Sequence, residues 1–424
     1  MQTSPLEFRS SGSVPARLSR SDAPAACLEE GGITMAQDLE IRLFDRMEPL
    51  EADWRKLEAE PANSLHQAYD WCSAWTKTHH NPLAIIHGRR NGETAFILPL
   101  EIVQNSMVRC AQFIAGRFNN INSGLFSAAF RANAGAAEAE QIRHALVTLL
   151  SGKADLVSLA NVAFEWRGER HPLSTLPAIE NQNRSFQLPL LGDFELTLGQ
   201  LNARRRRKKF RSQCRRLEST GGYQHVIART ATEKSAMLET FFEQKAIRFK
   251  ALGIPNVFQP RETQAFFRML LEVDNSSHDT PLELHAIQLK GEFNGRIVAI
   301  AGMSRKAGHV ICQFGSIDDS VVSDVSPGEL LFWLMIEQGS NEGDTLFDFG
   351  LGDQEYKRRW CTIETVQHDI LIPINLTGRL AAIAQHGVTW AKTVIKSNPH
   401  LYAVIQRLRA RADDAPARPS AAED

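Results

Sequence analysis

The sequence predicts a mixed α/β (α+β) protein built of two lobes, each with a mainly antiparallel sheet flanked by helices. Three observations carry this prediction. The chain has 424 residues, which exceeds one typical domain. Apolar runs of strand length alternate with segments of helical period along both halves. Apolar residues make up 43% and charged residues 23%, as in an ordinary globular protein.

Composition narrows the possible functions. The formal net charge of -1 argues against nucleic-acid binding by the whole chain. The six cysteines form no CxxC pair and no metal spacing, which favours reduced residues in a cytoplasmic protein without a metal site. No apolar stretch reaches the length of a membrane helix, so we expect no transmembrane segment, although peripheral membrane contact stays open.

The N-terminal segment, 1–37, is rich in Ser, Ala, Arg and Pro and has no hydrophobic period, so we expect it to be disordered. A transit peptide fits its composition only as far as Ala26. The codons for Glu29 to Gly32 must form a purine-rich run that resembles a bacterial ribosome-binding site. We therefore hypothesise that Met35 is the true start, which a native N-terminal peptide from upstream of Met35 would contradict.

The first lobe is expected over 38–195. An aromatic stripe, Tyr69, Trp71 and Trp75, lies on its second helix, and a core role is favoured over a ligand platform. Asn91-Gly92 is a strong signal for a β-hairpin. This half contains no obvious catalytic cluster. The predicted strands are 39–44, 83–87, 95–102 and 156–161, and the predicted helices are 47–59, 64–79 and 137–150.

The second lobe is expected over 196–375 and opens with a basic helix from about 198 to Gly221. Nine basic residues lie between Arg204 and Arg216. Three interpretations stay open: a solvated helix face, a dock for an anionic partner such as a CoA phosphate, a glycolipid or a membrane headgroup, or a nucleic-acid surface. Nucleic acid is the least favoured, because the run has no interleaved aromatic residues and no recognisable DNA-binding motif.

Further elements follow in the order helix, helix and three antiparallel strands. The helix over 231–249 is expected to bury Met237, Phe241, Phe242 and Ile247. Glu292 to Gly295 and Lys306 to Gly308 are expected hairpin turns. The other predicted elements are a strand at 223–228, a helix at 261–272, and strands at 282–289, 296–304 and 309–314.

The stretch from Ser326 to Trp360 is the most informative part of the chain. Ser326 suits an N-cap, Pro327 the first helical position and Glu329 a capping box, so a helix is expected to begin here. A buried strand, 345–350, and a short helix follow. Amide groups at a helix N-terminus can hold a phosphate, but these residues alone favour a purely structural, well-capped helix, and the charge of Glu329 counts against an anion.

The pattern SPG-x-LL, followed by FDFG-x-G-x-x-x-YK-x-x-W, resembles the CelD/BcsL-type, BioF2-like acetyltransferases of the GNAT superfamily. FemAB-type aminoacyl transferases share that broader fold. The resemblance extends loosely from Leu39 to Pro373 and implies two tandem GNAT-like lobes. It implies an acyl-CoA donor in a gap between the strands at 309–314 and 345–349, and an acceptor cleft between the lobes.

The resemblance also implies site residues. Donor binding is expected at the helix start, through Val325, Ser326, Gly328, Glu329 and Leu330. Tyr356 would protonate the leaving thiolate, although packing against Trp360 explains it equally well. Candidate bases are Asp348, Glu355, Asp353 and His309. Lys357 would meet an acceptor carboxylate or a CoA phosphate. Glu243 and Arg248 would border the acceptor cleft, with a surface ion pair as the alternative.

The implied function is transfer of an acyl group from an acyl-CoA co-substrate to a sugar, an exopolysaccharide or a cell-envelope precursor. Direct attack is favoured over a covalent intermediate, because no Ser-His-Asp motif is visible and nothing indicates an activated Cys312. A FemAB-type transferase using aminoacyl-tRNA is the alternative, with Arg204 to Arg216 on RNA. A non-catalytic scaffold for polysaccharide synthesis is a third. Residues 376–411 predict one or two amphipathic helices and 412–424 a disordered tail.

Overall fold

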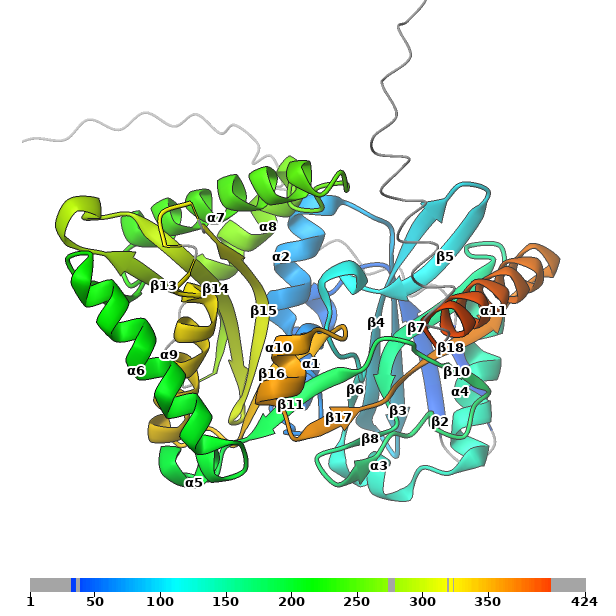
Figure 1. Cartoon of the computed structure of the whole chain (residues 1–424). Coiled ribbons are helices and arrows are strands. Elements are labelled where there is room, and N and C mark those ends of the chain that lie inside the picture. Colours follow the sequence, from blue (N-terminus) through cyan, green and yellow to red (C-terminus); the bar gives the residue numbers. More distant parts are fainter. Residues whose placement is uncertain (1–31, 36–38, 274–278, 319, 323, 398–424) are drawn as a thin grey trace, which may run out of the picture.

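The computed structural model describes residues 32–35, 39–273, 279–318, 320–322 and 324–397. Two helix-flanked sheets lie side by side, one from each half of the chain (Figure 1). The predicted mixed α/β fold with two lobes is confirmed. None of the described helices has the length and hydropathy of a segment that crosses a bilayer.

The first sheet has the strand order β1-β2-β3-β4-β5-β7-β18-β10, and β6 pairs with β4. Asn91 and Gly92, with φ of 53° and 81°, form the predicted hairpin turn between β3 and β4. The strands are β1 (Gly32–Met35), β2 (Leu39–Phe44), β3 (Leu83–Arg90), β4 (Glu93–Asn105), β5 (Val108–Phe113), β6 (Leu125–Phe126), β7 (Leu156–Ala163), β10 (Ala178–Glu180) and β18 (Gln367–Pro373). A separate small hairpin joins β8 (Glu165–Trp166) to β9 (Glu169–Arg170).

Part of the predicted disordered segment is ordered. Gly32–Met35 forms β1, which pairs antiparallel with β2 from Gly32 opposite Arg42 to Met35 opposite Leu39. The open edge of β2 offers unpaired backbone groups, and these recruit a short extended segment whatever its composition. The rest of the 1–37 prediction, and the predicted tail at 412–424, lie outside the described residues.

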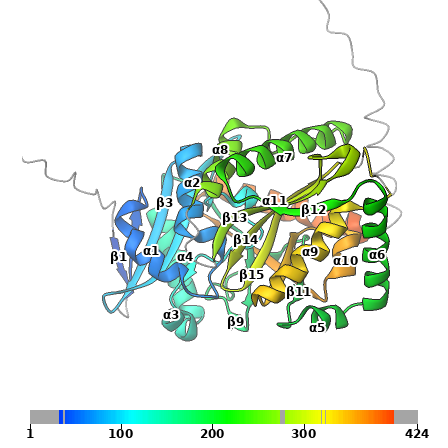
Figure 2. The ribbon, with the colours of Figure 1, turned by 90° about the vertical axis from the view of Figure 1, so that its left-hand side faces the viewer.

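The second sheet has the order β12-β13-β14-β15-β16-β11-β17. Helices α7 and α8 pack on one face, and α9 lies on the other with α6 beside it (Figure 2). The strands are β12 (Tyr223–Ile227), β13 (Thr280–Leu289), β14 (Ile297–Lys306), β15 (His309–Ile317), β16 (Leu346–Leu351), β11 (Ser185–Pro189) and β17 (Ile363–Thr365).

The helices agree closely with the predicted ones, with two corrections. The basic helix does not begin near 198, because Asn202 interrupts it and caps α6 by accepting a hydrogen bond from the amide of Arg205. Ile247 is 70% exposed, since it lies six residues after Phe241 and so off the buried stripe. The helices are α1 (Glu51–Glu58), α2 (Tyr69–His79), α3 (Ala128–Asn133), α4 (Ala136–Leu149), α5 (Phe194–Gly199), α6 (Ala203–Ser219), α7 (Ala231–Ala251), α8 (Arg261–Glu272), α9 (Pro327–Glu342), α10 (Glu355–Trp360) and α11 (Leu376–Ser397).

The sheets exchange strands across the division that the sequence suggests at 195/196. β11 comes from the first part of the chain but pairs with β16 and β17 in the second sheet. β18 comes from the second part but pairs with β7 and β10 in the first sheet. Each sheet is therefore completed by a strand from the other half of the chain.

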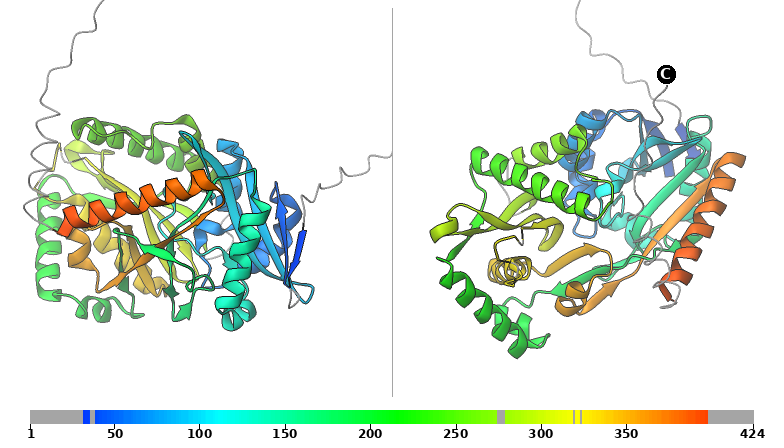
Figure 3. Two further views of the ribbon diagram at one scale, coloured as in Figure 1. Left: turned by 90° about the vertical axis from the view of Figure 1, so that its right-hand side faces the viewer. Right: turned by 45° about the horizontal axis from the view of Figure 1, so that its top comes forward.

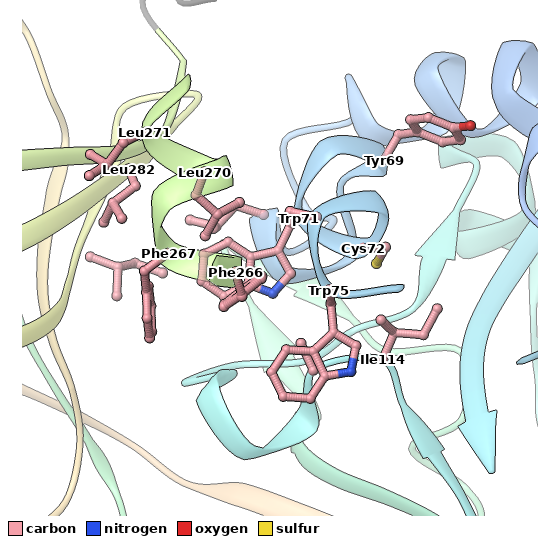
Figure 4. Packing of buried hydrophobic residues seen from close by; sticks show 14 of the residues in the cluster. Tyr69, Trp71, Cys72, Trp75, Ile114, Phe266, Phe267, Leu270, Leu271 and Leu282 are labelled. Atoms are coloured by element: carbon pink, nitrogen blue, oxygen red, sulfur yellow. The ribbon is translucent and has the colours of Figure 1, made fainter. Parts of the chain in front are cut away.

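One hydrophobic core continues from lobe to lobe. Trp71 and Trp75 of α2 each hold their ring 5.2 Å from that of Phe266 on α8. Figure 4 shows Phe266 and Leu270 of α8 on the side that faces α2. Tyr69, Trp71 and Trp75 are 8%, 1% and 5% exposed, which confirms the aromatic stripe as core. The lobes are thus joined by an apolar contact along α2 and α8.

Candidate functional site

The centre of the second sheet opens into a gap between β15 and β16. These strands are parallel and pair at only three positions, His309 with Leu346, Val310 with Phe347 and Ile311 with Asp348. Beyond Ile311, β15 continues to Ile317 along β14, while β16 continues to Leu351 along β11. The two strands therefore part where the family resemblance implies a donor site, and the unpaired edges that face each other form what we call the gap.

A β-bulge at Gln313 begins the gap. In the register of β14 and β15, Gly302 lies opposite Phe314 and Met303 opposite Cys312, which leaves Gln313 as the extra residue. A Cβ on Gly302 would lie 2.3 Å from the ring of Phe314, so this ring needs glycine beneath it. Because a bulge bends its strand and increases the local twist, Gln313 turns β15 away from β16.

Helix α9 begins at the mouth of the gap, but not as the sequence suggests. Ser326 adopts a left-handed conformation with φ of 57° and makes no side-chain cap, so the predicted capping box is wrong. Gln213 of α6 holds this turn from outside, because its Nε2 donates to the carbonyl oxygen of Val325 at 2.8 Å and to that of Ser326 at 3.0 Å. The carbonyl oxygen of Ser326 also accepts from the amides of Glu329 and Leu330, so the helix starts on backbone bonds and not on a side-chain cap.

Glu329 is drawn to the basic helix. Its Oε2 lies 2.5 Å from Nζ of Lys209 and 3.8 Å from a guanidinium nitrogen of Arg206. Arg206 is itself buried and stacks 4.1 Å from the ring of Trp360. Two members of the basic run are thus structural, and they offset the negative charge at the start of α9.

The predicted donor residues divide into exposed and buried ones. Ser326 is exposed and Glu329 half-buried, whereas Val325, Gly328 and Leu330 are buried. A Cβ on Gly328 would lie 2.8 Å from Cδ1 of Ile317, so the first turn of α9 lies directly against the end of β15. Backbone amides at this turn, rather than side chains, are the groups that can meet an anion.

Tyr356 lies on α10 beside the gap. Its ring centroid is 5.3 Å from that of Phe332 and 6.0 Å from that of Phe349. Burial raises the pKa of the phenol well above its ordinary value, and the nearby thiols of Cys312 and Cys361 raise this pKa further. The hydroxyl therefore stays protonated at neutral pH, as a proton donor must.

Lys357 is only 4% exposed and bonds to the chain itself. Its Nζ donates to the carbonyl oxygen of Gly350 at 3.0 Å and to that of Leu351 at 2.7 Å. Burial lowers the pKa of its ammonium group. In this structure Lys357 therefore ties α10 to the end of β16, and its charge does not face an open surface.

The candidate bases fall into two groups, with Asp348 and His309 in contact and Glu355 and Asp353 apart from them. Asp348 is 1% exposed; its carboxylate accepts from Nε2 of Gln187 at 2.8 Å and the amide of Gly350 at 2.7 Å, and lies 3.2 Å from Nε2 of His309. This network occupies the closed end of the gap. Glu355 pairs with Arg359, and Asp353 with Arg358 at 2.6 Å, on the outer side of α10.

The first lobe reaches into the gap through Asn120. Its Nδ2 donates to Oε1 of Gln313 at 2.9 Å, and its Oδ1 accepts from the amide of Leu351 at 3.3 Å. Nε2 of His66 lies 3.2 Å from the same Gln313 oxygen. Gly350, with φ of 69°, leaves room for this contact, because a Cβ there would lie 2.6 Å from Oδ1 of Asn120. Sequence reasoning did not identify Asn120 as a residue of this site. The only feature of the sequence that points to its contact is the glycine at position 350.

On α7 the predicted acceptor residues, Glu243 and Arg248, are exposed, and the residue that turns inward is Lys245. Its Nζ lies 5.5 Å from the ring centroid of Phe249 and 5.9 Å from those of Phe241 and Phe258. Burial lowers its pKa, and Cys312 is close enough to oppose that shift. Sequence reasoning gave Lys245 no role, because an inward lysine on a helix has no local signature.

Comparison with known proteins agrees with the site's position. Residues 204–358 match the family model described as an acetyltransferase (GNAT) domain, a segment that runs from α6 to α10 and includes the gap. The crystal structure of FemX is similar to this chain with a TM-score of 0.53 at 13% identity, over 76% of this chain and 95% of FemX. At this identity the likeness to FemX shows the fold alone.

Two further structures are similar over most of this chain. L-PGS from Bacillus licheniformis has a TM-score of 0.49 at 11% identity, over 80% of this chain and 96% of its own. A tandem GNAT protein from the clavulanic acid biosynthesis pathway has a TM-score of 0.43 at 11% identity, over 80% and 99%. No curated protein sequence matches significantly.

Proposed function

We propose that the protein is an acyltransferase that moves an acyl group from acetyl-CoA or another acyl-CoA to an amino or hydroxyl group. The acceptor would be a sugar, an exopolysaccharide or a cell-envelope precursor, as in the CelD/BcsL type. The observation that carries the proposal is the gap between β15 and β16, with an uncapped helix start at its mouth. A cytoplasmic location is part of this proposal.

The donor fits the gap in two respects. The first turn of α9 has no side-chain cap, and the amide of Gly328 and the positive end of the helix dipole are the groups proposed to meet a pyrophosphate. The amides of Glu329 and Leu330 donate to the carbonyl oxygen of Ser326. Lys209 and Arg206 offset the charge of Glu329, which would otherwise repel that group. The edge of β15 beyond Ile311 would then accept the arm that carries the thioester.

The chemistry needs one bond made and one broken. The acceptor nitrogen or oxygen attacks the thioester carbonyl carbon, and the carbon–sulfur bond breaks. The leaving thiolate takes a proton, which the phenol of Tyr356 supplies. A base takes the acceptor's proton; Asp348 and Glu355 are our candidates, and Glu355 is the one with an exposed side chain.

The acceptor is proposed to approach from the side of α7. Glu243 and Arg248 lie there as exposed charges, and Lys245 faces inward beside Cys312. In this scheme Lys357 acts through the two carbonyl oxygens that it holds at the end of β16. It would thereby position α10, and with it Tyr356.

A FemAB-type transferase that uses aminoacyl-tRNA is the second candidate, and the likeness to FemX favours it. Its RNA would contact α6. Six basic residues of that helix are exposed, namely Arg204, Arg205, Lys208, Arg211, Arg215 and Arg216. Arg216 is paired with Asp324, at 2.9 Å.

Calorimetric titration with acetyl-CoA and longer acyl-CoAs tests the proposal. We expect saturable binding by the wild type, and a loss of more than about tenfold in Gly328→Glu, since the new carboxylate meets the pyrophosphate. Gly135→Glu is the matched control, because it places the same charge at the start of α4 in the first lobe. Circular dichroism checks that both variants fold.

The same preparations separate the alternatives. A protein that binds no acyl-CoA, but transfers an amino acid from aminoacyl-tRNA in a reaction that RNase abolishes, would be the FemAB-type enzyme. A protein that binds neither donor and shows no transfer would contradict both enzymatic proposals and leave the scaffold role.

A further inference from the structure

Lys245 of α7 is a half-buried lysine whose ammonium group has no hydrogen-bond acceptor and no carboxylate partner among the described residues. Its Nζ lies near three aromatic rings instead, 5.5 Å from the centroid of Phe249 and 5.9 Å from those of Phe241 and Phe258. We call Lys245 and these rings the lysine cage. Ring faces attract a cation only weakly, and an ammonium group has three N–H donors. The described part of the chain uses none of these donors.

The other lysines that are buried or half-buried in the described structure all have acceptors. Lys306 and Lys357 are buried, and each donates to two backbone carbonyl oxygens. The half-buried Lys234 donates to a carbonyl oxygen at 2.7 Å, and the half-buried Lys209 pairs with a carboxylate at 2.5 Å. Removing an ammonium group from water costs free energy unless a partner replaces the water. Lys245 therefore lacks the partner that the fold gives to each of the other four.

The lysine cage lies where the second lobe meets the first. Figure 3, right, shows α7 beside α8, with the blue α2 of the first lobe next to them. The ring of Phe258 is 5.7 Å from that of Phe118 in the first lobe. The thiol of Cys312, beside the bulge that begins the gap, influences the pKa of Lys245 and that of Tyr356. The cage therefore borders the gap on the side from which the acceptor is proposed to approach.

We propose that the ammonium group of Lys245 binds an anionic group of the acceptor, a carboxylate or a phosphate, and thereby selects an acidic sugar or an acidic envelope precursor. An ion pair at a half-buried ammonium group is stronger than one in open water, because less water screens it. Arg248 is exposed three residues further along α7 and adds positive charge. The inference rests on the proposed function, which makes the ligand at this place an acyl acceptor.

The position of the donor supports this assignment. Its phosphates are proposed to lie at the start of α9, which packs on the opposite face of the sheet from α7 (Figure 2). An anion that reaches Lys245 therefore belongs to the acceptor.

Reductive methylation of lysines in the full-length protein, read by peptide mass spectrometry, tests whether an anion binds to Lys245. Inorganic phosphate and acetate are the two probes, and sodium chloride keeps the ionic strength equal. We expect phosphate, acetate or both to slow the methylation of Lys245 at least about threefold. Lys250, an exposed lysine at the end of the same helix, is the control, and its rate should not change. The probe that protects Lys245 identifies the anion as a phosphate or a carboxylate.

Transfer assays with acetyl-CoA connect this anion to the acceptor. Glucosamine 6-phosphate carries a phosphate, muramic acid carries a carboxylate, and glucosamine is the reference without an acid group. We expect the wild type to prefer an acid-bearing sugar about tenfold in kcat/KM, and Lys245→Met to remove this preference by raising the KM of that sugar. Lys250→Met is the matched control and should keep the preference. Methionine packs well among aromatic rings, so Lys245→Met is expected to fold, which circular dichroism checks.

Two results would overturn the inference. In one, neither phosphate nor acetate slows the methylation of Lys245. In the other, Lys245→Met keeps the wild-type preference for the acid-bearing sugar. Failure of the proposed function gives a different result, since the protein then binds no acyl-CoA and acylates no sugar. Anion protection of Lys245 in such a protein would support the anion site and contradict acyl transfer.

Discussion

The two lobes each join two strands in parallel, and only the junction of β15 and β16 is bridged by a side chain from the other lobe, that of Asn120. In the first lobe β5 and β7 pair from Cys110 with Leu156 to Gln112 with Ser158, the same number of positions as β15 and β16. The loop after β5 then fills the space beyond. The backbone amide of Asn122 donates to the carbonyl oxygen of Asn161, and its side-chain Nδ2 donates to the carbonyl oxygen of Ala160, both at 2.8 Å.

The helices that follow these junctions differ in the same way. Glu138 of α4 folds back and accepts a hydrogen bond from the amide of Gly135 at 2.9 Å, so the start of α4 is closed by its own side chain. At α9 the equivalent carboxylate of Glu329 is held by α6 instead. The two helix starts therefore differ in what holds the carboxylate at this position: the backbone of the same turn at α4, and the basic helix α6 at α9.

The largest expected effect is on turnover, at the junction of β15 and β16. Tyr356→Phe should lower kcat about 100-fold with little change in KM, because the leaving thiolate loses its proton donor. Tyr69→Phe in the first lobe is the control, and it should leave turnover unchanged. Steady-state kinetics with an acyl-CoA donor decide this. Equal kcat values for Tyr356→Phe and wild type would leave Tyr356 only its packing role.

Acid should destabilise the first lobe. Burial lowers the pKa of His66 to about 4, and it lowers those of His87 to about 4 and His171 to about 3. The imidazole of His66 binds a proton more readily in the unfolded chain than in the native protein. Its contribution to the free energy of unfolding is therefore fully present above about pH 6.5. This contribution is lost as the pH falls toward 4, by up to about 3 kcal/mol.

Substitution isolates the share of His66. His66→Gln should flatten the pH dependence of the free energy of unfolding between pH 6.5 and 4, and urea titrations at both ends of this range measure it. An unchanged slope in the variant would show that other groups dominate the acid response.

The bridge between the lobes should have a smaller effect. Asn120→Ala removes the contacts to Gln313 and to the amide of Leu351, both of which are part-buried. The Gln313 oxygen keeps the contact to Nε2 of His66, whereas the Leu351 amide loses its bond to Asn120. We expect a loss of about 2 kcal/mol in the free energy of unfolding, measured in urea. Asn133→Ala, an exposed site at the end of α3, is the control. Comparable losses in both variants would rule out a special role for the bridge.

The smallest effect compares the two helix starts directly. Glu329→Gln should tighten acyl-CoA binding a few-fold, because a negative charge leaves the proposed pyrophosphate site. Glu138→Gln at α4 should leave binding unchanged and change stability by less than about 1 kcal/mol, because glutamine also completes the capping box and only the ion pair with Arg90 is lost. Calorimetry and thermal unfolding measure the two quantities. Weaker donor binding by Glu329→Gln would place the phosphates elsewhere.

Local pattern predicted most of the elements. The helix α8 and the hairpin turn at Asn91 follow from hydrophobic period and turn chemistry, which depend only on neighbouring residues. Asp348 points away from Phe347 and Phe349, as strand alternation requires. The likeness to a family placed the gap between the right strands, which composition and period could not do.

The remaining features depend on contacts between distant parts of the chain. Ser326 has the residue type of a cap, but Gln213 of another helix takes over the turn, a tertiary contact without a local signal. The bulge at Gln313 depends on the register of β14, and Asn120 reaches the gap only because the lobes pack together. Polar contacts between the lobes join residues far apart in the sequence, so no regular spacing of residues in a single sequence indicates them.

The exchanged strands have a consequence for how the chain is made. The first sheet needs β18, so β7 keeps an unpaired edge until residues 367–373 have left the ribosome. Long-range pairing of this kind folds slowly, and an open strand edge can recruit the wrong partner while it waits. Chaperone demand during synthesis should therefore be highest before β18 emerges, and a ribosome stalled just short of it would display a half-closed sheet.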